Sequence, residues 1–552
     1  MSSALLERRW ECTEASVPEL PPPHSYGQAA VVALLAIATG LVVFLLRAVY
    51  LNRSYNVFID ELVYLRLARS VATNLHVEAF GHPFYIHPPA FFFLEAAYLK
   101  AFGISGRLID QLFAVRYLNV ALAALSAVAL YEIARRCAGW WAALAAAALF
   151  SLDPFIIEIN SRNMLETSAI WWVLAGYWIL FTGDLGGKHI ALSTPRSVAV
   201  GVMFGLAILS KDMMAFLTFL PLAVLFVLAW ALSRRTIATI VTMTCLTYAP
   251  YPVIVALVGQ WDGFSRIKFH GVERVLGLVQ DTGFHHSSAP SFLTTVVARL
   301  DHYGTTYALI AAGAISVCLL ALRGGAANRL LAVWTGSAYA LLAYGILFGT
   351  LEEQFFYYLV VPAIAATAVV SARALGKGGI EGRARIRLLA LMLTLAVVFV
   401  GWSGYRWIYT HSTPGDGYEQ VLNYLDRRVP PNHRHVSATD VGAQFLLERY
   451  STPPWGLWHS LTQLQTYRPE YLLISHDQYT WDNGDSASTL LDWVAHHGQR
   501  VLDIPGNGDG TNGPVDLYHF TPSAWPARVE AHTLRRHVVH VASNRYQHRT
   551  RQ

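Results

Sequence analysis

Long apolar runs separated by polar connections make up most of the chain. The first run covers residues 28–50 and, at about 1.5 Å of rise per residue, is long enough to cross a bilayer as one helix. Because a long polar stretch with three prolines precedes it, a permanent helix is favoured over a cleaved signal peptide. Further runs predict helices at 111–136, 139–157, 164–182, 197–212, 213–232, 236–259, 303–322, 329–350, 357–373 and 385–405. The pattern therefore predicts about 11 transmembrane helices.

Two of the connections are long, and the chain changes character near its end. The long connections cover residues 51–110 and 260–299, and both exceed the few residues that usually join neighbouring helices. Beyond residue 410 polar residues dominate, with a helix-like pattern at 417–428 and a strand-like run at 471–475. We therefore expect an all-α polytopic membrane domain at 28–410, preceded by a tail at 1–27 and followed by a small α/β soluble domain at 411–552.

Positive charges in the short connections predict the orientation, because Lys and Arg resist transfer across the membrane. Every basic cluster falls on the same side of the predicted helices as the N-terminus, which places that terminus in the cytoplasm. With an odd number of helices, residues 51–110, 260–299 and 411–552 are then extracytoplasmic. The clusters are Arg8 and Arg9, Arg135 and Arg136, Lys188 and Arg196, Arg234 and Arg235, Arg323 and Arg329, and residues 373–387.

The composition also indicates a membrane protein. Hydrophobic residues make up 54% of the chain and charged residues 14%, and the mean hydropathy is +0.37, which is hard to reconcile with a soluble fold of this length. The net charge of +5 comes largely from the cytoplasmic connections and a basic C-terminal tail, so it does not indicate nucleic-acid binding. The 4 cysteines map to the cytoplasmic side or within helices, which argues against disulfides in the outer parts.

Two adjacent carboxylates, Asp60 and Glu61, follow the first predicted helix at the outer membrane edge. An apolar surrounding raises the pKa of a carboxylate, which suits a general base. The alternative is that one of the two caps the amphipathic run at 62–74. The sequence leaves both roles open, one for each residue.

Three further charged or titratable residues map to the same outer face. His87 precedes Pro88 and Pro89, and the double proline directs the histidine back towards the end of the first helix. A substrate-binding, orienting or metal-ligand role for His87 competes with that of an ordinary hydrogen-bonded loop histidine. Glu166 opens the fourth helix, where its charge complements the helix dipole, and Arg162 is placed to pair with it.

Lys211 ends the fifth predicted helix at the outer membrane boundary. A cation at the edge of a hydrophobic groove lies where the phosphate of a lipid would sit, so Lys211 is the candidate phosphate-binding residue. The alternatives are that Lys211 snorkels to the interface or pairs with Asp212.

Taken together, these segments resemble the polyprenyl-phosphate-sugar-dependent glycosyltransferases of the GT-C superfamily. The resemblance is to the branch of the protein O-mannosyltransferases and the lipid A aminoarabinose transferases, and it extends from the N-terminus to about residue 370. The segments that carry it are Asp60 with Glu61, and residues 87–89, 162–166, 205–211 and 355–362.

The resemblance implies a membrane domain of the GT-C type and an inverting transfer in which Asp60 deprotonates an acceptor hydroxyl. It places Glu166 on the acceptor or sugar side, and Glu61 and Glu166 are further candidate catalytic acids. Several relatives carry an Arg before the tyrosine of the tenth helix, whereas this chain has Glu353 and Gln354. We therefore expect the donor phosphate to contact Lys211, Arg266, Lys268 and Tyr358, and the substrates to contact His87, Arg162 and His270.

The expected function is that of an integral membrane glycosyltransferase. It would move a hexosyl or pentosyl group from a polyprenyl-phosphate donor to an envelope glycan, protein or lipid, with membrane lipids but no nucleic acid as partners. No cofactor is firmly implied, and a divalent metal ion near His87 or His270 stays open.

Two alternatives come from other classes of protein. A transporter or flippase typically has ionisable residues near the bilayer midplane, whereas most acids here lie at helix ends. A membrane-anchored envelope binding protein would not explain why acids and a lysine gather at one rim of the outer face.

Overall fold

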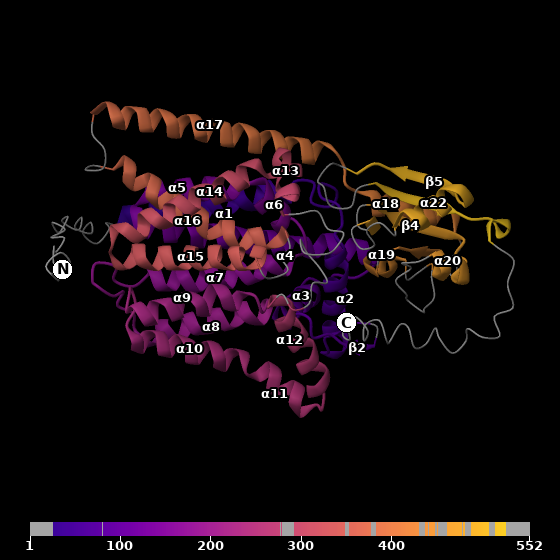
Figure 1. The fold of residues 1–552 in the computed structure, drawn as a ribbon, viewed down its shortest axis with the longest axis horizontal. Helices are drawn as coiled ribbons and strands as arrows, with labels where there is room; N and C mark the ends of the chain where they lie inside the picture. The colour runs from indigo at the N-terminus through magenta and orange to yellow at the C-terminus, as the bar shows by residue number, and fades with distance from the viewer. Residues whose placement is uncertain are drawn as a thin grey trace, which may run out of the picture.

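The computed structural model describes residues 26–79, 81–276, 278, 292–347, 353–376, 382–429, 436–439, 441–447, 450, 461–476, 479–480, 487–506 and 514–525. These residues form a helical bundle that is joined at one end to a small α/β domain (Figure 1). The tail at 1–27 lies almost entirely outside the described residues, as does the basic segment 526–552.

Helices occur at all the positions where the apolar runs predict them. Those long and apolar enough to span a membrane are α1 (Tyr26–Ala48), α4 (Leu108–Ala138), α10 with α11 (Arg234–Tyr248 and Pro250–Leu257), α14 (Leu300–Arg323), α15 (Ala326–Leu347), α16 (Phe356–Leu375) and α17 (Gly382–Ser412). Three shorter apolar helices accompany them, namely α7 (Leu165–Phe181), α8 (Thr194–Ser210) and α9 (Met214–Leu228). The all-α polytopic membrane domain is thereby confirmed.

The predicted helix at 139–157 is not one straight helix. It consists of α5 (Trp140–Leu152) and α6 (Pro154–Asn160), which are bent by 66° relative to each other. Pro154 has no N–H group to continue the hydrogen bonds of α5, and the Asp153 carboxylate accepts the Ile156 N–H at 2.9 Å as the cap of α6. Asp153 also accepts the Thr306 hydroxyl of α14 at 2.8 Å, so the break is held by a neighbouring helix.

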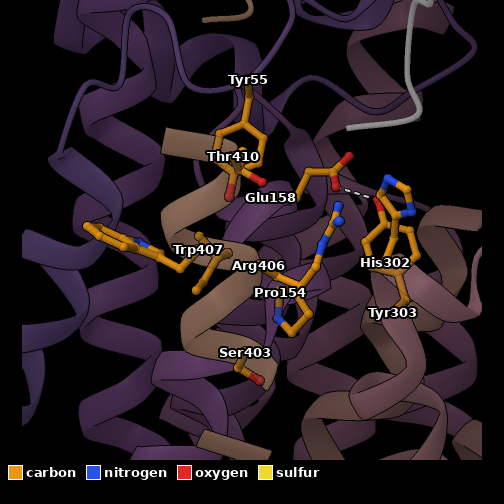
Figure 2. A pocket seen from close by; sticks show the side chains of 10 residues that line it. Tyr55, Pro154, Glu158, His302, Tyr303, Ser403, Arg406, Trp407 and Thr410 are labelled. Carbon is orange, nitrogen blue, oxygen red and sulfur yellow. Dashed lines mark hydrogen bonds between the residues drawn. The ribbon is translucent and has the colours of Figure 1, made fainter. Parts of the chain in front are cut away.

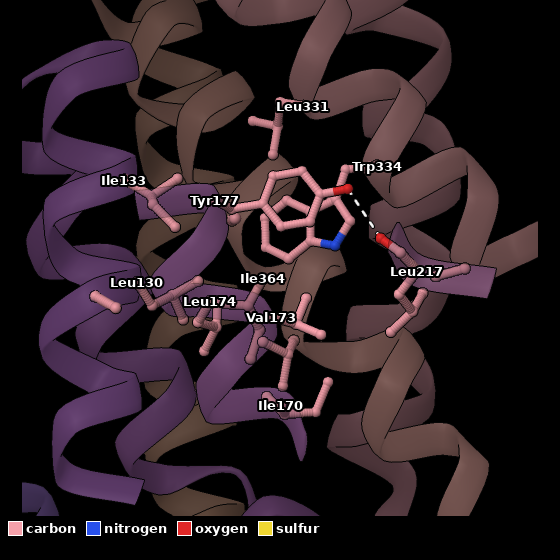
Figure 3. Packing of buried hydrophobic residues seen from close by; sticks show 14 of the residues in the cluster. Leu130, Ile133, Ile170, Val173, Leu174, Tyr177, Leu217, Leu331, Trp334 and Ile364 are labelled. Atoms are coloured by element: carbon pink, nitrogen blue, oxygen red, sulfur yellow. Dashed lines mark hydrogen bonds between the residues drawn. The ribbon is translucent and has the colours of Figure 1, made fainter. Parts of the chain in front are cut away.

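Aromatic stacking fills the centre of the bundle. Tyr177 of α7 lies flat against Trp334 of α15, with ring centroids 4.2 Å apart, and both are buried among Leu130 of α4 and Ile364 of α16 (Figure 3). The Tyr177 hydroxyl donates to the Leu217 carbonyl of α9 at 2.9 Å, which satisfies its polar group in an apolar surrounding. Dense packing of this kind is what drives helix association in a membrane.

The long connection at 51–110 is folded, and it lies between the bundle and the α/β domain (Figure 1). It contains α2 (Ile59–Asn74), the hairpin of β1 (Glu78–Ala79) and β2 (His82–Pro83), and α3 (Ala90–Ala101). In the second long connection α12 (Trp261–Val275) and α13 (Phe292–Ala298) are described, and η3 (Glu353–Phe355) precedes α16. We call the end of the bundle at which α2, α3 and the α/β domain lie the domain end.

The C-terminal region is a small α/β domain, as predicted. Its sheet has the order β3-β4-β6-β5, with β3 parallel to β4 and the other pairs antiparallel. One face packs on α2 through a shared core that includes Leu62, Leu65, Leu425 and Leu517. The elements are α18 (Gly417–Arg428), β3 (Val436–Ala438), α19 (Val441–Leu446), α20 (Leu461–Tyr467), β4 (Tyr471–Ser475), α22 (Ala487–His497), β5 (Gln499–Ile504), β6 (Val515–His519) and η5 (Pro522–Ala524).

Candidate active site at the domain end

An apolar cluster joins the segments that carry the candidate residues. Tyr64 of α2, Phe91 and Phe92 of α3, and Leu165 at the start of α7 pack together and are buried. Asp60 lies one helical turn before Tyr64, and Glu166 directly follows Leu165. The fold therefore brings the first connection and the start of α7 together at the domain end.

Asp60 begins a short chain of polar contacts. The Tyr64 hydroxyl lies 3.3 Å from Asp60 Oδ2 and 3.4 Å from His87 Nε2, and the Tyr64 and His87 rings meet edge to face. Asp60 and His87 are both half-buried. If Tyr64 donates to Asp60, His87 donates to Tyr64, so the three side chains can orient one another.

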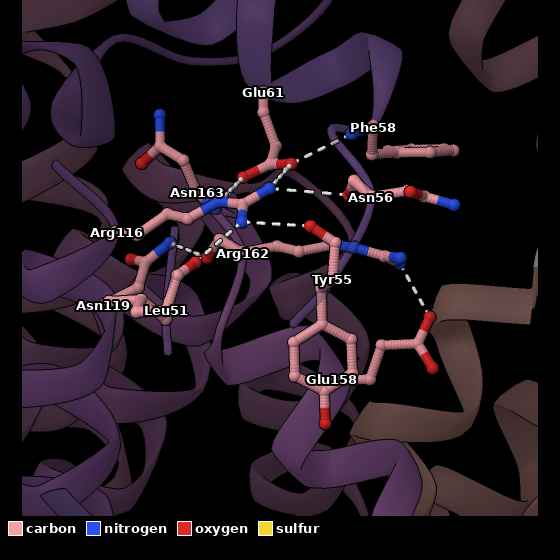
Figure 4. A network of polar contacts seen from close by, with 10 residues as sticks. All are labelled: Leu51, Tyr55, Asn56, Phe58, Glu61, Arg116, Asn119, Glu158, Arg162 and Asn163. Carbon is pink, nitrogen blue, oxygen red and sulfur yellow. Dashed lines mark hydrogen bonds and ion pairs between the residues drawn. The ribbon is translucent and has the colours of Figure 1, made fainter. Parts of the chain in front are cut away.

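Glu61 has a different surrounding, since its side chain is fully buried in a polar network (Figure 4). It forms an ion pair with Arg116 of α4, with Nε–Oε1 at 2.9 Å and Nη2–Oε2 at 2.8 Å. It also accepts the backbone N–H groups of Phe58 at 2.9 Å and Asn163 at 2.6 Å. The bond from Phe58 caps the first turn of α2, which is the alternative that the sequence left open for one of the two acids.

Arg162 pairs with Glu158, not with Glu166 as the sequence suggested. Arg162 Nη1 lies 2.6 Å from Glu158 Oε1, four residues earlier, and its guanidinium stacks over the Tyr55 and Phe58 rings (Figure 4). The prediction was wrong because α6 ends at Asn160, so the turn before α7 directs Arg162 back to α6.

Lys211 and Glu166 form an ion pair that is almost completely buried, with 5% and 0% of their side chains exposed. Neither alternative for Lys211 is observed, because its ammonium group is buried and its partner is Glu166, not Asp212. Two rings flank the ammonium nitrogen, with centroids 5.4 Å away at Phe355 and 5.7 Å away at Tyr358. These contacts hold one cation between α7, α8 and α16 at the domain end.

The basic residues of the second long connection have unequal positions. Lys268 of α12 pairs with Asp212, the residue after Lys211, and Asp212 also accepts the Tyr248 hydroxyl at 3.3 Å. His270 Nδ1 lies 3.5 Å from Glu273 within the same helix, and Arg266 is exposed. Of the three candidates, Lys268 is therefore the one tied to the Lys211 segment.

Glu95 is a buried acid that we did not predict from the sequence. Its Oε1 accepts the Asn163 side-chain amide at 2.8 Å, while Oε2 has no hydrogen-bond partner among the described residues. Burial raises the pKa of Glu95 to about 8, the Asn163 bond opposes this, and the charge of Glu61 adds to it. A lone acid in the apolar run of α3 was the available signal.

In the described part of the chain, no group of three or more His, Cys, Asp or Glu side chains is placed to hold a metal ion. The two metal candidates make separate contacts, since His87 meets Tyr64 and His270 meets Glu273.

The fold of this chain, with its helical bundle, folded first connection and appended α/β domain, is similar to the folds of solved membrane-protein structures. ArnT from Cupriavidus metallidurans, bound to undecaprenyl phosphate, is similar with a TM-score of 0.55 and 15% identity, over 92% of this chain and 100% of that one. The archaeal oligosaccharyltransferase AglB from Archaeoglobus fulgidus, in complex with an inhibitory peptide and a dolichol-phosphate, is similar with a TM-score of 0.53 and 14% identity, over 91% of this chain and 76% of that one. At this identity the likeness shows the fold.

A sequence comparison points in the same direction. Residues 86–258 match the family described as Dolichyl-phosphate-mannose-protein mannosyltransferase. The matched span contains His87, Arg162, Glu166 and Lys211, and it begins after Asp60. No curated protein sequence matches the chain.

Proposed function

We propose that the protein transfers a sugar from a polyprenyl-phosphate donor to an acceptor hydroxyl at the domain end, with inversion at the anomeric carbon. The observation that carries this proposal is the joint placement of two groups on a GT-C fold. One is Asp60 with Tyr64 and His87, and the other is Lys211 with Glu166 between two aromatic rings. The apolar cluster around Tyr64 and Leu165 packs their segments together.

Asp60 is the proposed general base. Its half-buried carboxylate is oriented by the Tyr64 hydroxyl, whereas the carboxylate of Glu61 lies in a buried ion pair with Arg116. As the acceptor oxygen attacks the anomeric carbon, its proton passes to Asp60 and the bond from that carbon to the phosphate oxygen breaks. A single displacement of this kind inverts the configuration, and polyprenyl phosphate leaves.

Lys211 is the proposed contact for the departing phosphate. An ammonium group has three N–H donors, and Glu166 accepts from one of them, so the others can bind phosphate oxygens. A fixed cation in a surrounding that excludes water stabilises the charge that develops on the leaving group. Lys268, which pairs with Asp212, is the proposed second cation. It would take the role of the arginine that several relatives carry where this chain has Glu353 and Gln354.

The remaining candidates are assigned by their contacts. His87 and Tyr64 are proposed to orient Asp60 and the acceptor, and Tyr358 to line the phosphate site beside Lys211. Arg162 and Glu61 belong to the buried network that supports the start of α2. Arg266 and His270 stay proposed contacts to the donor or substrate from α12.

The orientation completes the proposal. The basic clusters support a cytoplasmic N-terminus, so the domain end and residues 411–552 face the extracytoplasmic side of the cell membrane. The acceptor is then an envelope glycan, protein or lipid.

The test compares envelope glycans and glycoproteins, by mass spectrometry, in a strain that lacks the gene. The strain is complemented with the wild-type chain or with Asp60→Asn at equal abundance in the membrane. Loss of one glycan linkage, restored by the wild type and not by Asp60→Asn, supports the proposal and identifies the acceptor. An unchanged profile in the deleted strain contradicts it.

A further inference from the structure

The last membrane helix buries polar residues and exposes apolar ones. α17 is 31 residues long, and the residues that it buries are Ser403, Arg406 and Thr410. Their spacing of three and four residues places them on one face of the helix. A charged side chain inside a membrane-spanning segment is costly and usually marks a functional site.

This face of α17 lines a pocket with two other helices (Figure 2). Glu158 of α6 and His302 and Tyr303 of α14 form the opposite wall, and the Arg406 guanidinium points towards them. The pocket lies between α6, α14 and α17, whereas Lys211 lies between α7, α8 and α16. It is therefore a site separate from the proposed donor site.

Arg406 makes no hydrogen bond or close ion pair in the described part of the chain, although the residue is only 9% exposed, and its interaction with the Asp301 carboxylate of α14 is a longer-range electrostatic one. Its guanidinium makes a cation–π contact with Tyr409 of its own helix, with the ring centroid 5.1 Å away. The hydroxyl of Ser403, which is 1% exposed, likewise has no hydrogen-bond partner among the described residues. A buried cation and a buried hydroxyl without hydrogen-bond partners point to a ligand that is anionic and accepts hydrogen bonds.

The acids that line or adjoin the pocket are already engaged. Glu158 accepts from Arg162 at 2.6 Å with one oxygen and from the Tyr303 hydroxyl with the other. His302 lies 2.8 Å from its neighbour Asp301. The ion pair with Arg162 neutralises Glu158, and the Asp301 side chain is 63% exposed, so Arg406 is the positive charge that faces the pocket.

We propose that this pocket binds the phosphate group of an anionic membrane lipid. Arginine donates two parallel hydrogen bonds to a phosphate, and Ser403 and Thr410 can supply hydroxyl donors from the same face. Arg406 lies six residues before the end of α17, about 9 Å along the helix, so it stands near the end of the membrane-spanning helix rather than at its middle. Exposed apolar side chains lie on the outer surfaces of α17 and α14, for example Val398 at 60% and Ile315 at 64% exposure. The acyl chains of the bound lipid can pack against them.

The experiment measures how much phosphatidylglycerol the purified, full-length protein retains in native mass spectrometry across a lipid titration. Arg406→Gln removes the positive charge from the pocket. Thr410→Trp fills the pocket with a large side chain and keeps the charge of Arg406. Each should weaken retention about tenfold or more, the scale of a lost hydrogen bond to a charged group. Arg53→Gln, which removes an exposed cation stacked on Tyr50, should retain the lipid as the wild type does.

Two further arms separate the sources of the signal. Lys211→Ala should leave phosphatidylglycerol retention unchanged, whereas a loss equal to that of Arg406→Gln would place the lipid at the donor site and overturn the proposal. Inorganic phosphate should not displace the lipid, and full displacement would indicate a site for free phosphate instead. Retention at the wild-type level in both pocket variants overturns the proposal outright. If thermal unfolding shows that Arg406→Gln does not fold, lipid retention by Thr410→Trp, which keeps the arginine, tests the proposal.

Discussion

Glu61 and Arg116 form a two-point ion pair in which neither side chain is exposed to solvent. Arg116 also donates to the backbone carbonyls of Leu51 and Tyr55, at 3.0 and 3.1 Å, and so holds the chain that leads from α1 to α2. The pair therefore fixes the start of α2 against α4, and with it the position of Asp60, which precedes Glu61.

The first prediction concerns this pair. If Glu61 were only a helix cap, its loss would cost about 0.5–2 kcal/mol, but leaving Arg116 buried without its partner costs about 3–5 kcal/mol. Glu61→Gln should therefore lower the midpoint of thermal unfolding in detergent strongly, and Arg116→Gln should do the same. The double variant should lose less than the sum of the two. Additive losses would mean that the two side chains act independently.

The second prediction separates the base from its neighbour. Asp60→Asn keeps the shape of the side chain but cannot take the acceptor's proton, so transfer should slow by roughly a hundred- to ten-thousand-fold. Single-turnover transfer from a labelled polyprenyl-phosphate sugar is the measurement, and binding of the donor should persist. Asp110→Asn is the matched control, because that acid is exposed and pairs with Arg107. A rate near that of the wild type in Asp60→Asn would remove Asp60 as the base.

The sequence predicts where helices form but not which side chains meet. Apolar runs determine each membrane helix locally, so their positions could be predicted. Asp60 and Glu61 are adjacent, and successive residues of a helix point about 100° apart, so which of them turns inward depends on where Arg116 lies in the folded chain. Lys211 likewise has its partner 45 residues earlier, at Glu166, a distance that no local pattern covers.

Two local features of the sequence could have predicted more of the structure. The Asp-Pro pair at 153–154 combines a helix cap with a residue that interrupts helical hydrogen bonds, and it accounts for the 66° bend between α5 and α6. Arg406 stands in an apolar run near the end of α17, where a charge is costly without a function. Both were visible in the sequence, whereas the Thr306 hydroxyl that binds Asp153 and the pocket wall that Arg406 faces come from helices distant along the chain.

The third prediction concerns pH. Burial raises the pKa of Glu95 in the folded protein from its ordinary value of 4.5 to about 8, so the folded protein holds this proton more tightly than the unfolded chain does. The resulting stability is fully present below about pH 4.5 and is lost as the pH rises to about 8. The midpoint of thermal unfolding should fall across that range in the wild type. Glu95→Gln, which mimics the neutral acid, should flatten the decline, whereas Glu78→Gln should not.

The pH prediction has a clear opposite. If Glu95→Gln and the wild type decline in parallel, another group is responsible for the pH dependence. If the midpoint of thermal unfolding instead fell as the pH was lowered from about 8 to about 4.5, Glu95 would be charged in the folded protein.

The fourth prediction concerns topology. A periplasmic-type reporter fused after Trp407 should be active, and one fused after Arg234 should be inactive, because basic connections stay in the cytoplasm. A cytoplasmic reporter at the same two sites should give the complementary result. The reverse pattern would move the domain end to the cytoplasmic side, and with it the proposed site of transfer.

The last prediction concerns the buried pair of Lys211 and Glu166. A phosphate at this site needs a cation, so Lys211→Ala should weaken binding of the polyprenyl-phosphate donor much more than Lys211→Arg does. Lys100→Ala is the control, because Lys100 is an exposed cation of α3. Donor binding is measured by titration with the labelled lipid, separately from the single-turnover rate.

Glu166 distinguishes a phosphate site from a structural ion pair. If the pair is only structural, Glu166→Gln should lower thermal stability and leave donor affinity unchanged in the folded fraction. If Lys211 binds phosphate, Glu166→Gln removes the carboxylate that competes for its N–H groups, so donor affinity should rise while the stability falls. Equal donor affinity in the wild type, Lys211→Ala and Glu166→Gln would leave the pair structural, and the phosphate contact would then have to come from Lys268 or Arg266 of α12.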